Sequence, residues 1–237
     1  MKKILFDNQM FTLQRFGGVT RYFADLMYNL PKGEFVAEVP MRYCENHYVT
    51  KTYGQEYEKI TFPDNYRFRR QVYMLVNKHI AWKAIRFGNY DIFHPTYFNP
   101  YFLKSVKRSG KPFVLTVHDM TFERYPQDVL IYDRTIPHKK RLIAEADHII
   151  AVSENTKRDI IELLGTDPSK ISVVHHGYRP IAEPAPQLFD RYVLYVGERK
   201  GYKNFLPWLS AIRSIFNLDP NLKIVCTGSP FSASELK

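Results

Sequence analysis

Short apolar segments alternate with amphipathic helical stripes along most of this 237-residue chain, and this alternation constrains the fold more than any other feature. Buried parallel strands are written as short apolar runs, whereas surface helices repeat apolar residues every three or four positions. Strands are predicted at 3–6, 35–41, 90–94, 112–117, 148–152 and 171–175. Helices are predicted between them at 19–30, 71–87, 133–146 and 154–164, the last with Ser153 as its N-cap. Such βαβ repeats favour an α/β, Rossmann-like domain with a parallel sheet.

The texture of the chain changes at residues 179–190, where three prolines exclude a helix or a central strand. Beyond this stretch a strand is predicted at 192–196, a helix at about 204–218 and a strand at 222–226. We therefore predict a Rossmann-like domain at 1–178, an interdomain linker at 179–190 and the incomplete start of a second Rossmann-like domain at 191–237. Two strands and one helix make a small core, so we expect an exposed apolar face and an unpaired sheet edge that favour self-association.

Composition excludes several classes of protein. Hydrophobic residues make up 45% and charged residues 24% of the chain, which fits a globular protein and argues against a disordered or collagen-like one. No apolar run approaches the ~20 residues that span a bilayer, and the apolar stretch before Asp7 is too short for a signal-peptide core. Cys44 and Cys226 can build no disulfide framework. We expect a cytoplasmic protein.

Basic residues exceed acidic ones by 34 − 24 = +10, which attracts phosphate, nucleic acid or anionic lipid. Part of the excess lies in segment 66–87, which has six basic residues, several aromatic residues and no acidic residue. On the predicted helix 71–87 of this segment, one side carries Val72, Leu75, Val76, His79, Ile80 and Lys83. The segment predicts peripheral membrane contact, and an ordinary amphipathic helix with a solvated basic face is the alternative. No nucleic-acid module is recognisable, so nucleic acid is not an expected partner.

Open parallel sheets bind ligands beyond the carboxyl ends of their strands, so residues that follow a predicted strand are the candidates for a site. These candidates are Gly17, Gly18, Arg21, His94, His118, Asp119, Ser153, Glu154, His175, His176 and the loop 198–203. Gly17 and Gly18 precede a helix, where bare backbone lets a phosphate approach the first amides. A simple turn is the alternative. Arg199 and Lys203 lie near another helix start and suit a diphosphate, with a solvated basic loop as the alternative.

Histidines form the second group of candidates. His118 follows a buried strand, and Asp119 beside it is able to orient the imidazole; a structural histidine is the alternative. His175 and His176 are adjacent on an extended segment and point to opposite faces, which favours a structural role. The sequence has no Asp-x-Asp pair and no His or Cys spacing suited to zinc, so we expect no tightly bound metal.

Four motifs together resemble the glycosyltransferases of family 4, which have the GT-B fold, and in particular bacterial mannosyltransferase-like members of surface-polysaccharide synthesis. The motifs run from Gly17 to Tyr22, from Thr116 to Asp119, from Ala151 to Thr156 and from Tyr195 to Asn204. The resemblance implies two Rossmann-like domains, of which the C-terminal one holds a nucleotide-sugar and the N-terminal one serves the acceptor. The motif loop at 17–22 and the segment 195–204 argue against a GT-B sugar epimerase.

The resemblance also implies residue roles. Gly17 and Gly18 would lie near the donor diphosphate, His118 near the transferred sugar and acceptor, and Arg199 and Lys203 would stabilise the departing diphosphate. Arg21, His94, Asp119 and Ser153 remain as candidates for the acceptor side or the crevice. The implied reaction retains anomeric configuration and needs neither a metal nor another cofactor. GDP-mannose is the favoured donor and UDP-sugars stay open. The acceptor is a glycan or a lipid-linked molecule, and the expected place of the protein is the cytoplasm, with peripheral contact at the inner face of the membrane.

The chain departs from the family pattern in one respect. The family's pair of glutamates, seven residues apart, which binds the donor sugar and ribose, belongs to a position beyond Lys237. We therefore expect little or no transferase activity from these 237 residues alone. The alternative function is a non-enzymatic fragment that binds a glycan, a lipid or a partner chain.

Overall fold

The computed structural model describes the whole chain except residues 53, 55, 60–65, 127–133, 179–188, 198, 200–202, 220, 229 and 233–237. The chain divides into two compact units, Met1–Gly177 and Tyr178–Lys237. Most of the predicted linker at 179–190 lies outside the described residues, as do most of the loop 198–203 and the predicted helix start at 133.

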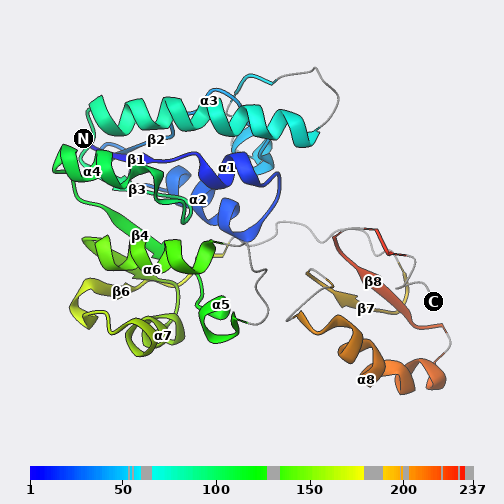
Figure 1. Ribbon diagram of the computed structural model, residues 1–237. Helices are drawn as coiled ribbons and strands as arrows, with labels where there is room; N and C mark the ends of the chain where they lie inside the picture. Colours follow the sequence, from blue (N-terminus) through cyan, green and yellow to red (C-terminus); the bar gives the residue numbers. More distant parts are fainter. Residues whose placement is uncertain are drawn as a thin grey trace. The chain divides into compact units, whose positions relative to one another are not determined.

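Six parallel strands form the sheet of the first unit. They are β1 (Lys2–Phe6), β2 (Phe35–Glu38), β3 (Ile92–His94), β4 (Val114–Val117), β5 (His148–Ala151) and β6 (Ile171–Val173). Hydrogen bonds join them in the orders β2-β1-β3 and β4-β5-β6, and one backbone bridge, Phe93 to Phe113, links β3 to β4. The strand order β2-β1-β3-β4-β5-β6 confirms the predicted Rossmann-like α/β class (Figure 1). From β1 the chain adds β2 on one side and β3 on the other, and sheets of this kind bind ligands at such a switch point between neighbouring strands.

Helices connect the strands and cover both faces of the sheet. They are α1 (Gln9–Leu13), α2 (Gly18–Tyr28), α3 (Tyr66–Phe87), α4 (Leu103–Ser109), α5 (Thr121–Arg124), α6 (Thr135–Glu145) and α7 (Glu154–Leu164), with shorter turns at Tyr48–Thr52, Pro100–Phe102 and Pro168–Lys170. Helices α2, α3, α6 and α7 confirm predicted elements, with shifted ends. Helices α1, α4 and α5 were not predicted, because helices this short carry too little of the 3.6-residue period.

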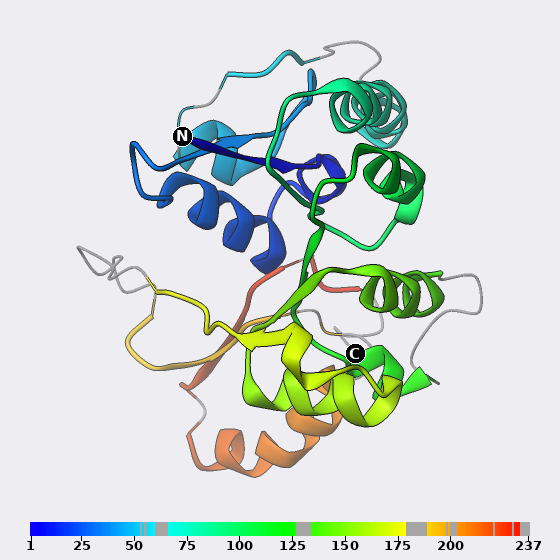
Figure 2. The ribbon, with the colours of Figure 1, turned by 90° about the vertical axis from the view of Figure 1, so that its left-hand side faces the viewer.

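The direction of each crossover decides which face a helix covers. The chain passes through α2 in one direction, from β1 to β2, and through the later helices in the other. Phe6 packs against Phe23 of α2 in one cluster, while Leu5 belongs to a larger cluster with Ile85 of α3 and Leu142 of α6. Helix α2 therefore lies on one face, and α3, α4, α6 and α7 lie on the other (Figure 2).

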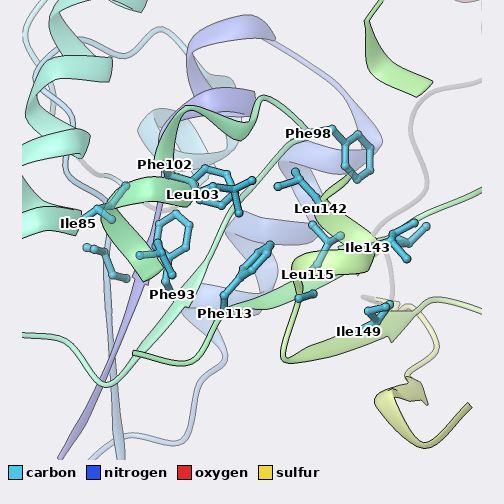
Figure 3. Packing of buried hydrophobic residues seen from close by; sticks show 14 of the residues in the cluster. Ile85, Phe93, Phe98, Phe102, Leu103, Phe113, Leu115, Leu142, Ile143 and Ile149 are labelled. Atoms are coloured by element: carbon cyan, nitrogen blue, oxygen red, sulfur yellow. The ribbon is translucent and has the colours of Figure 1, made fainter. Parts of the chain in front are cut away.

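Aromatic rings fill the larger cluster, which lies between the sheet and α3, α4, α6 and α7. Phe93, Phe102 and Phe113 are buried, and the Phe93 and Phe102 ring centroids are 4.8 Å apart (Figure 3). Phe93 and Phe113 also form the backbone bridge between β3 and β4. The packing of these rings thus supports the joint between the two halves of the sheet.

The buried side of α3 corrects the prediction. Leu75, which belongs to the predicted stripe, is 72% exposed, whereas Tyr73, Asn77, Ala81 and Ile85, which lie outside the stripe, are buried. Asn77 explains the shift. Its Oδ1 accepts from the backbone N–H groups of Arg42 and Tyr43, and its Nδ2 donates to Thr12 Oγ1 and Tyr43 O. A search for apolar stripes misses a helix that is oriented by a buried asparagine.

The second unit contains β7 (Tyr192–Tyr195), α8 (Phe205–Leu218) and β8 (Lys223–Cys226), and its two strands pair in parallel. These elements confirm the predicted strand, helix and strand. Phe205 is buried beside Tyr195 and Trp208, with ring centroids 4.9 Å apart for Tyr195 and Phe205. Leu194 and Leu206 are exposed by 50% and 61%. Exposed apolar side chains agree with the expectation for this unit, while self-association stays a prediction.

Candidate functional site

Residues from the ends of three strands gather against α2 and form what we call the histidine cluster: Tyr22, His94, Thr116, His118 and His176. Tyr22 Oη lies 3.3 Å from Thr116 Oγ1, and His94 Nε2 lies 2.9 Å from the same oxygen. The Tyr22 ring meets the His118 ring edge to face, with ring centroids 5.0 Å apart. The ring centroids of His118 and His176 are 5.6 Å apart. The structure thus brings together three histidines that the sequence placed after separate strands.

Sequence reasoning missed Tyr22 and Thr116. Tyr22 belongs to the apolar stripe of α2, and Thr116 lies inside an apolar strand. Neither position differs in pattern from an ordinary core position. The available signal was their place within two of the motifs, next to Arg21 and His118.

His118 is the member of the cluster best placed to contact a ligand. Its Nε2 is buried and has no hydrogen-bond partner in the described structure. Burial lowers the pKa of His118 to about 4, and repulsion from His176 adds to the shift, while Asp119 acts against it. The imidazole is therefore neutral near neutral pH and has one ring nitrogen available for hydrogen bonding to a bound molecule.

His94 supports the cluster from the interior. It is only 5% exposed, stacks on Phe6 with ring centroids 5.3 Å apart and makes its Nε2 contact with Thr116. Burial lowers the pKa of His94 to about 3, with a smaller contribution from His118. His94 is therefore a nearly inaccessible member of the cluster, and its contact with a ligand stays a prediction.

Neutral buried histidines make the stability of the fold depend on pH. Between pH 6.5 and about 4, the unfolded chain binds protons at His94 and His118 that the folded chain does not bind. The free energy of unfolding should therefore decrease as the pH is lowered through this window, by at most about 1.4 kcal/mol per pH unit for each histidine. His94→Asn should flatten this dependence in urea unfolding curves, whereas His148→Asn at the amino end of β5 should not. An unchanged slope in His94→Asn would contradict the assignment. Asp7, whose pKa is raised by burial, acts in the opposite direction and cancels in the comparison.

The start of α2 lies beside the histidine cluster in the chain and in space. Gly17 is the N-cap and makes no side-chain capping bond, so the first amides of α2 have no side-chain cap. A Cβ atom added at Gly18 would meet no atom within 4 Å, so an incoming group has room there. The partial positive charge of the helix start favours an anion. Arg21, one turn on, is exposed and lies 3.5 Å from Asp25 Oδ2 through its Nε.

Asp119 and Ser153 hold the loops around His118. Asp119 Oδ1 accepts from the backbone N–H of Thr121 at the start of α5. Ser153 confirms its predicted role as N-cap of α7, because its Oγ accepts from the backbone N–H of Thr156 at 3.1 Å. Thr156 Oγ1 in turn lies 3.3 Å from the carbonyl oxygen of His118, to which it donates. Contact of Asp119 or Ser153 with a substrate stays a prediction.

A buried ion pair supports the same loop. Lys139 Nζ lies 2.9 Å from Glu123 Oε2 and donates to the carbonyl oxygen of Asp119 at 3.0 Å. The two side chains are 3% and 1% exposed. The sequence showed Lys139 only as part of a charged run with Lys140 and Arg141, which are both exposed. Periodicity cannot distinguish such a buried lysine from its solvated neighbours.

Arg199 and Lys203 both lie in the second unit near the start of α8. Arg199 Nη2 donates to Pro230 O at 2.9 Å, and its guanidinium lies 4.5 Å from the ring centroid of Phe231. Lys203 is exposed, and its carbonyl oxygen accepts from Tyr195 Oη. The contact of this basic pair with a diphosphate stays a prediction.

Among the described residues, no three His, Cys, Asp or Glu side chains come together as metal ligands would. In the same part of the chain, no helix combines the length and the hydropathy that crossing a membrane requires.

The histidine cluster lies at the carboxyl edge of the parallel sheet, beside a helix start without a side-chain cap. Open parallel sheets commonly bind nucleotides and phosphates at this edge. Comparison with protein families names the class: the sequence pattern of Glycosyltransferase Family 4 matches residues 16–180. The match covers more than half of the chain, which therefore belongs to this family.

Solved structures of two glycosyltransferases resemble the chain more distantly. A glycosyltransferase from Rickettsia africae ESF-5 is 16% identical, with a TM-score of 0.48 over 96% of this chain and 69% of that one. Arabidopsis thaliana UGT89C1, solved in complex with UDP-L-rhamnose, is 8% identical, with a TM-score of 0.43 over 97% of this chain and 70% of that one. No curated protein sequence matches the chain significantly.

Proposed function

We propose that this glycosyltransferase moves a hexosyl group from a nucleotide-sugar to a glycan or lipid-linked acceptor, with His118 in contact with the transferred sugar. The observation that carries the proposal is the buried, neutral imidazole with an unpartnered Nε2 beside the uncapped start of α2. Glycosyl transfer leaves negative charge on the departing diphosphate, and helix-start amides stabilise such charge. In this arrangement Gly17 and Gly18 approach the diphosphate, and His118 hydrogen-bonds a hydroxyl group of the donor sugar or the acceptor.

Arg199 and Lys203 complete the donor side in this proposal. A guanidinium and an ammonium group supply the positive charge that stabilises the leaving diphosphate, so the proposed reaction needs no bound metal. The proposed reaction also retains the anomeric configuration of the donor, as the family resemblance implies. GDP-mannose is the first donor to test, followed by UDP-sugars. The proposed setting is surface-polysaccharide synthesis on the cytoplasmic side of the membrane.

Removal of these cations tests the proposal. In an active form of the enzyme that contains residues 1–237, Arg199→Ala and Lys203→Ala should each lower turnover by about 10²-fold. The free energy of unfolding should change by less than about 1 kcal/mol in Lys203→Ala, because its side chain is exposed. Arg213→Ala, an exposed arginine of α8, is the matched control and should turn over at the wild-type rate. Wild-type turnover in both variants would remove the pair from the site.

We further propose that α3 contacts the membrane that carries a lipid-linked acceptor. Leu75 and Phe87 are each 72% exposed, and Phe68 and Trp82 are 49% and 38% exposed on the same basic helix. Apolar side chains among lysines and arginines suit the surface of an anionic bilayer. Co-sedimentation with vesicles that contain phosphatidylserine, but not with neutral vesicles, is the expected result. Absence of binding to either kind of vesicle would contradict it.

A further inference from the structure

The first unit contains a cavity that no residue of the histidine cluster lines. A cavity of about 270 Å³ opens between α1, α3, the loop after β3 and the start of α6. Helices α3 and α6 cover the face of the sheet opposite to α2, and no member of the histidine cluster lines the cavity. Because the cavity and the cluster have no residue in common, the residues of one can be substituted without removing a residue of the other.

The wall of this cavity is fixed by internal hydrogen bonds. Gln9 is 8% exposed, and its Nε2 donates to Asp7 Oδ2 at 2.6 Å and to the carbonyl oxygen of Asn99 at 3.1 Å. The backbone N–H of Asn99 donates back to Gln9 Oε1 at 2.9 Å. Thr96 Oγ1, in the same loop, donates to Asp7 Oδ1 at 2.8 Å. These bonds hold the loop after β3 in one shape before any ligand binds, which limits the entropy lost on binding.

The described side chains that line the cavity carry positive charge. Lys78 and Arg134 line it together with His138, and no aspartate or glutamate is among its described lining residues. The Lys78 ammonium lies 5.6 Å from the ring centroid of Tyr101, which places the charge against the aromatic wall. Neither Lys78 nor Arg134 forms an ion pair with another described residue. Two cations without an acidic partner among the described residues favour a ligand with an anionic group.

Aromatic rings and the apolar side chains of Leu13 and Met74 also line the cavity. Tyr97, Phe98 and Tyr101 all line it. Flat ring faces suit the C–H faces of a pyranose, while the cations suit a carboxylate or phosphate on the same sugar. The cavity lies just below the roughly 300–1,000 Å³ of pockets for larger ligands, so it suits one monosaccharide unit better than a whole nucleotide-sugar.

We propose that this cavity binds an acidic sugar residue, meaning a monosaccharide unit that carries a carboxylate or a phosphate group. The proposal goes beyond the transfer reaction, and only the choice of a sugar as carrier of the anion rests on the proposed function. The cavity would hold an acidic unit of the glycan on which the enzyme acts, in contact with residues other than His118.

Calorimetric titration of the 237-residue chain tests this site with four probes: glucuronate, glucose 6-phosphate, glucose and inorganic phosphate. At least one acidic sugar should bind about tenfold more tightly than glucose and than inorganic phosphate, and the two acidic probes show whether the anion is a carboxylate or a phosphate. Lys78→Gln and Arg134→Gln should each weaken this binding by about tenfold. Lys83→Gln on α3 and Arg141→Gln on α6 remove exposed cations outside the cavity and should leave the affinity unchanged.

Each of the following results would overturn the proposal: failure of both acidic sugars to bind, equal affinity for glucose, equal affinity for inorganic phosphate, or unchanged affinity in both Lys78→Gln and Arg134→Gln. Thermal unfolding of each variant shows whether it is folded. His118→Ala should bind the acidic sugar normally, and loss of binding there would place the sugar in the histidine cluster instead. Lack of transferase activity with intact binding would count against the proposed function alone.

Discussion

His118→Ala should lower kcat/KM for sugar transfer by about 10² to 10³-fold in an active form of the enzyme that contains this chain. The change removes the one buried ring nitrogen of the histidine cluster that has no partner and is free to bind a ligand. Tyr22, Thr116 and His94 keep their mutual contacts in this variant, because their hydrogen bonds do not pass through His118. A radiometric transfer assay with GDP-mannose and with UDP-glucose measures the effect.

His148→Ala is the matched control for this variant. His148 begins β5 and therefore lies at the amino end of a strand, at the edge of the sheet opposite to the candidate site. Its rate should equal that of the wild type. Wild-type rates in His118→Ala, or an equal loss in both variants with folding intact, would show that the histidine cluster is not where sugar transfer takes place.

Lys139→Met should lower the free energy of unfolding of the first unit by about 3–5 kcal/mol. The change leaves the Glu123 carboxylate buried without its cation, and Glu123 Oε1 already lacks a hydrogen-bond partner in the described structure. The variant also loses the bond from Lys139 Nζ to the carbonyl oxygen of Asp119, beside His118. Urea unfolding followed by circular dichroism measures the loss.

Two companion variants separate the charge effect from packing. Lys140→Met removes an exposed lysine from the same helix and should change the stability by less than about 0.5 kcal/mol. The double variant Lys139→Met/Glu123→Leu should recover much of the lost stability, because replacing a whole buried ion pair by apolar side chains is often close to neutral. A loss below about 1 kcal/mol in Lys139→Met would mean that water reaches the pair and that it does not support the His118 loop.

The parts of the fold that the sequence predicts are those with a strong local signal. Strands β4 and β5 are apolar runs closed by polar residues, and α7 carries both a cap at Ser153 and a glycine, Gly165, in the left-handed region with φ 63°. These signals act within a few residues and survive any tertiary arrangement. The rule that ligands meet the carboxyl ends of parallel strands then leads to the neighbourhood of His118.

What the sequence could not predict depends on contacts between distant segments. Asn77 orients α3 through bonds to residues 35 positions away, and this placed Leu75 on the exposed side. Tyr22 and Thr116 join the site only because α2 packs across the ends of β3 and β4. Lys139 is buried because Glu123, 16 residues earlier, is buried with it. No pattern within one helix or strand contains these facts.

The configuration and the yield of the product test whether a retaining sugar transfer takes place at the histidine cluster. An active enzyme that contains residues 1–237 should transfer a hexosyl unit from a nucleotide-sugar and retain the anomeric configuration of the donor. His118→Ala should nearly abolish the product. Proton NMR of the product anomeric signal reads both configuration and yield. A retained anomer that disappears in His118→Ala and persists in His148→Ala is the predicted result. An inverted product, or a full yield from His118→Ala, would contradict the account.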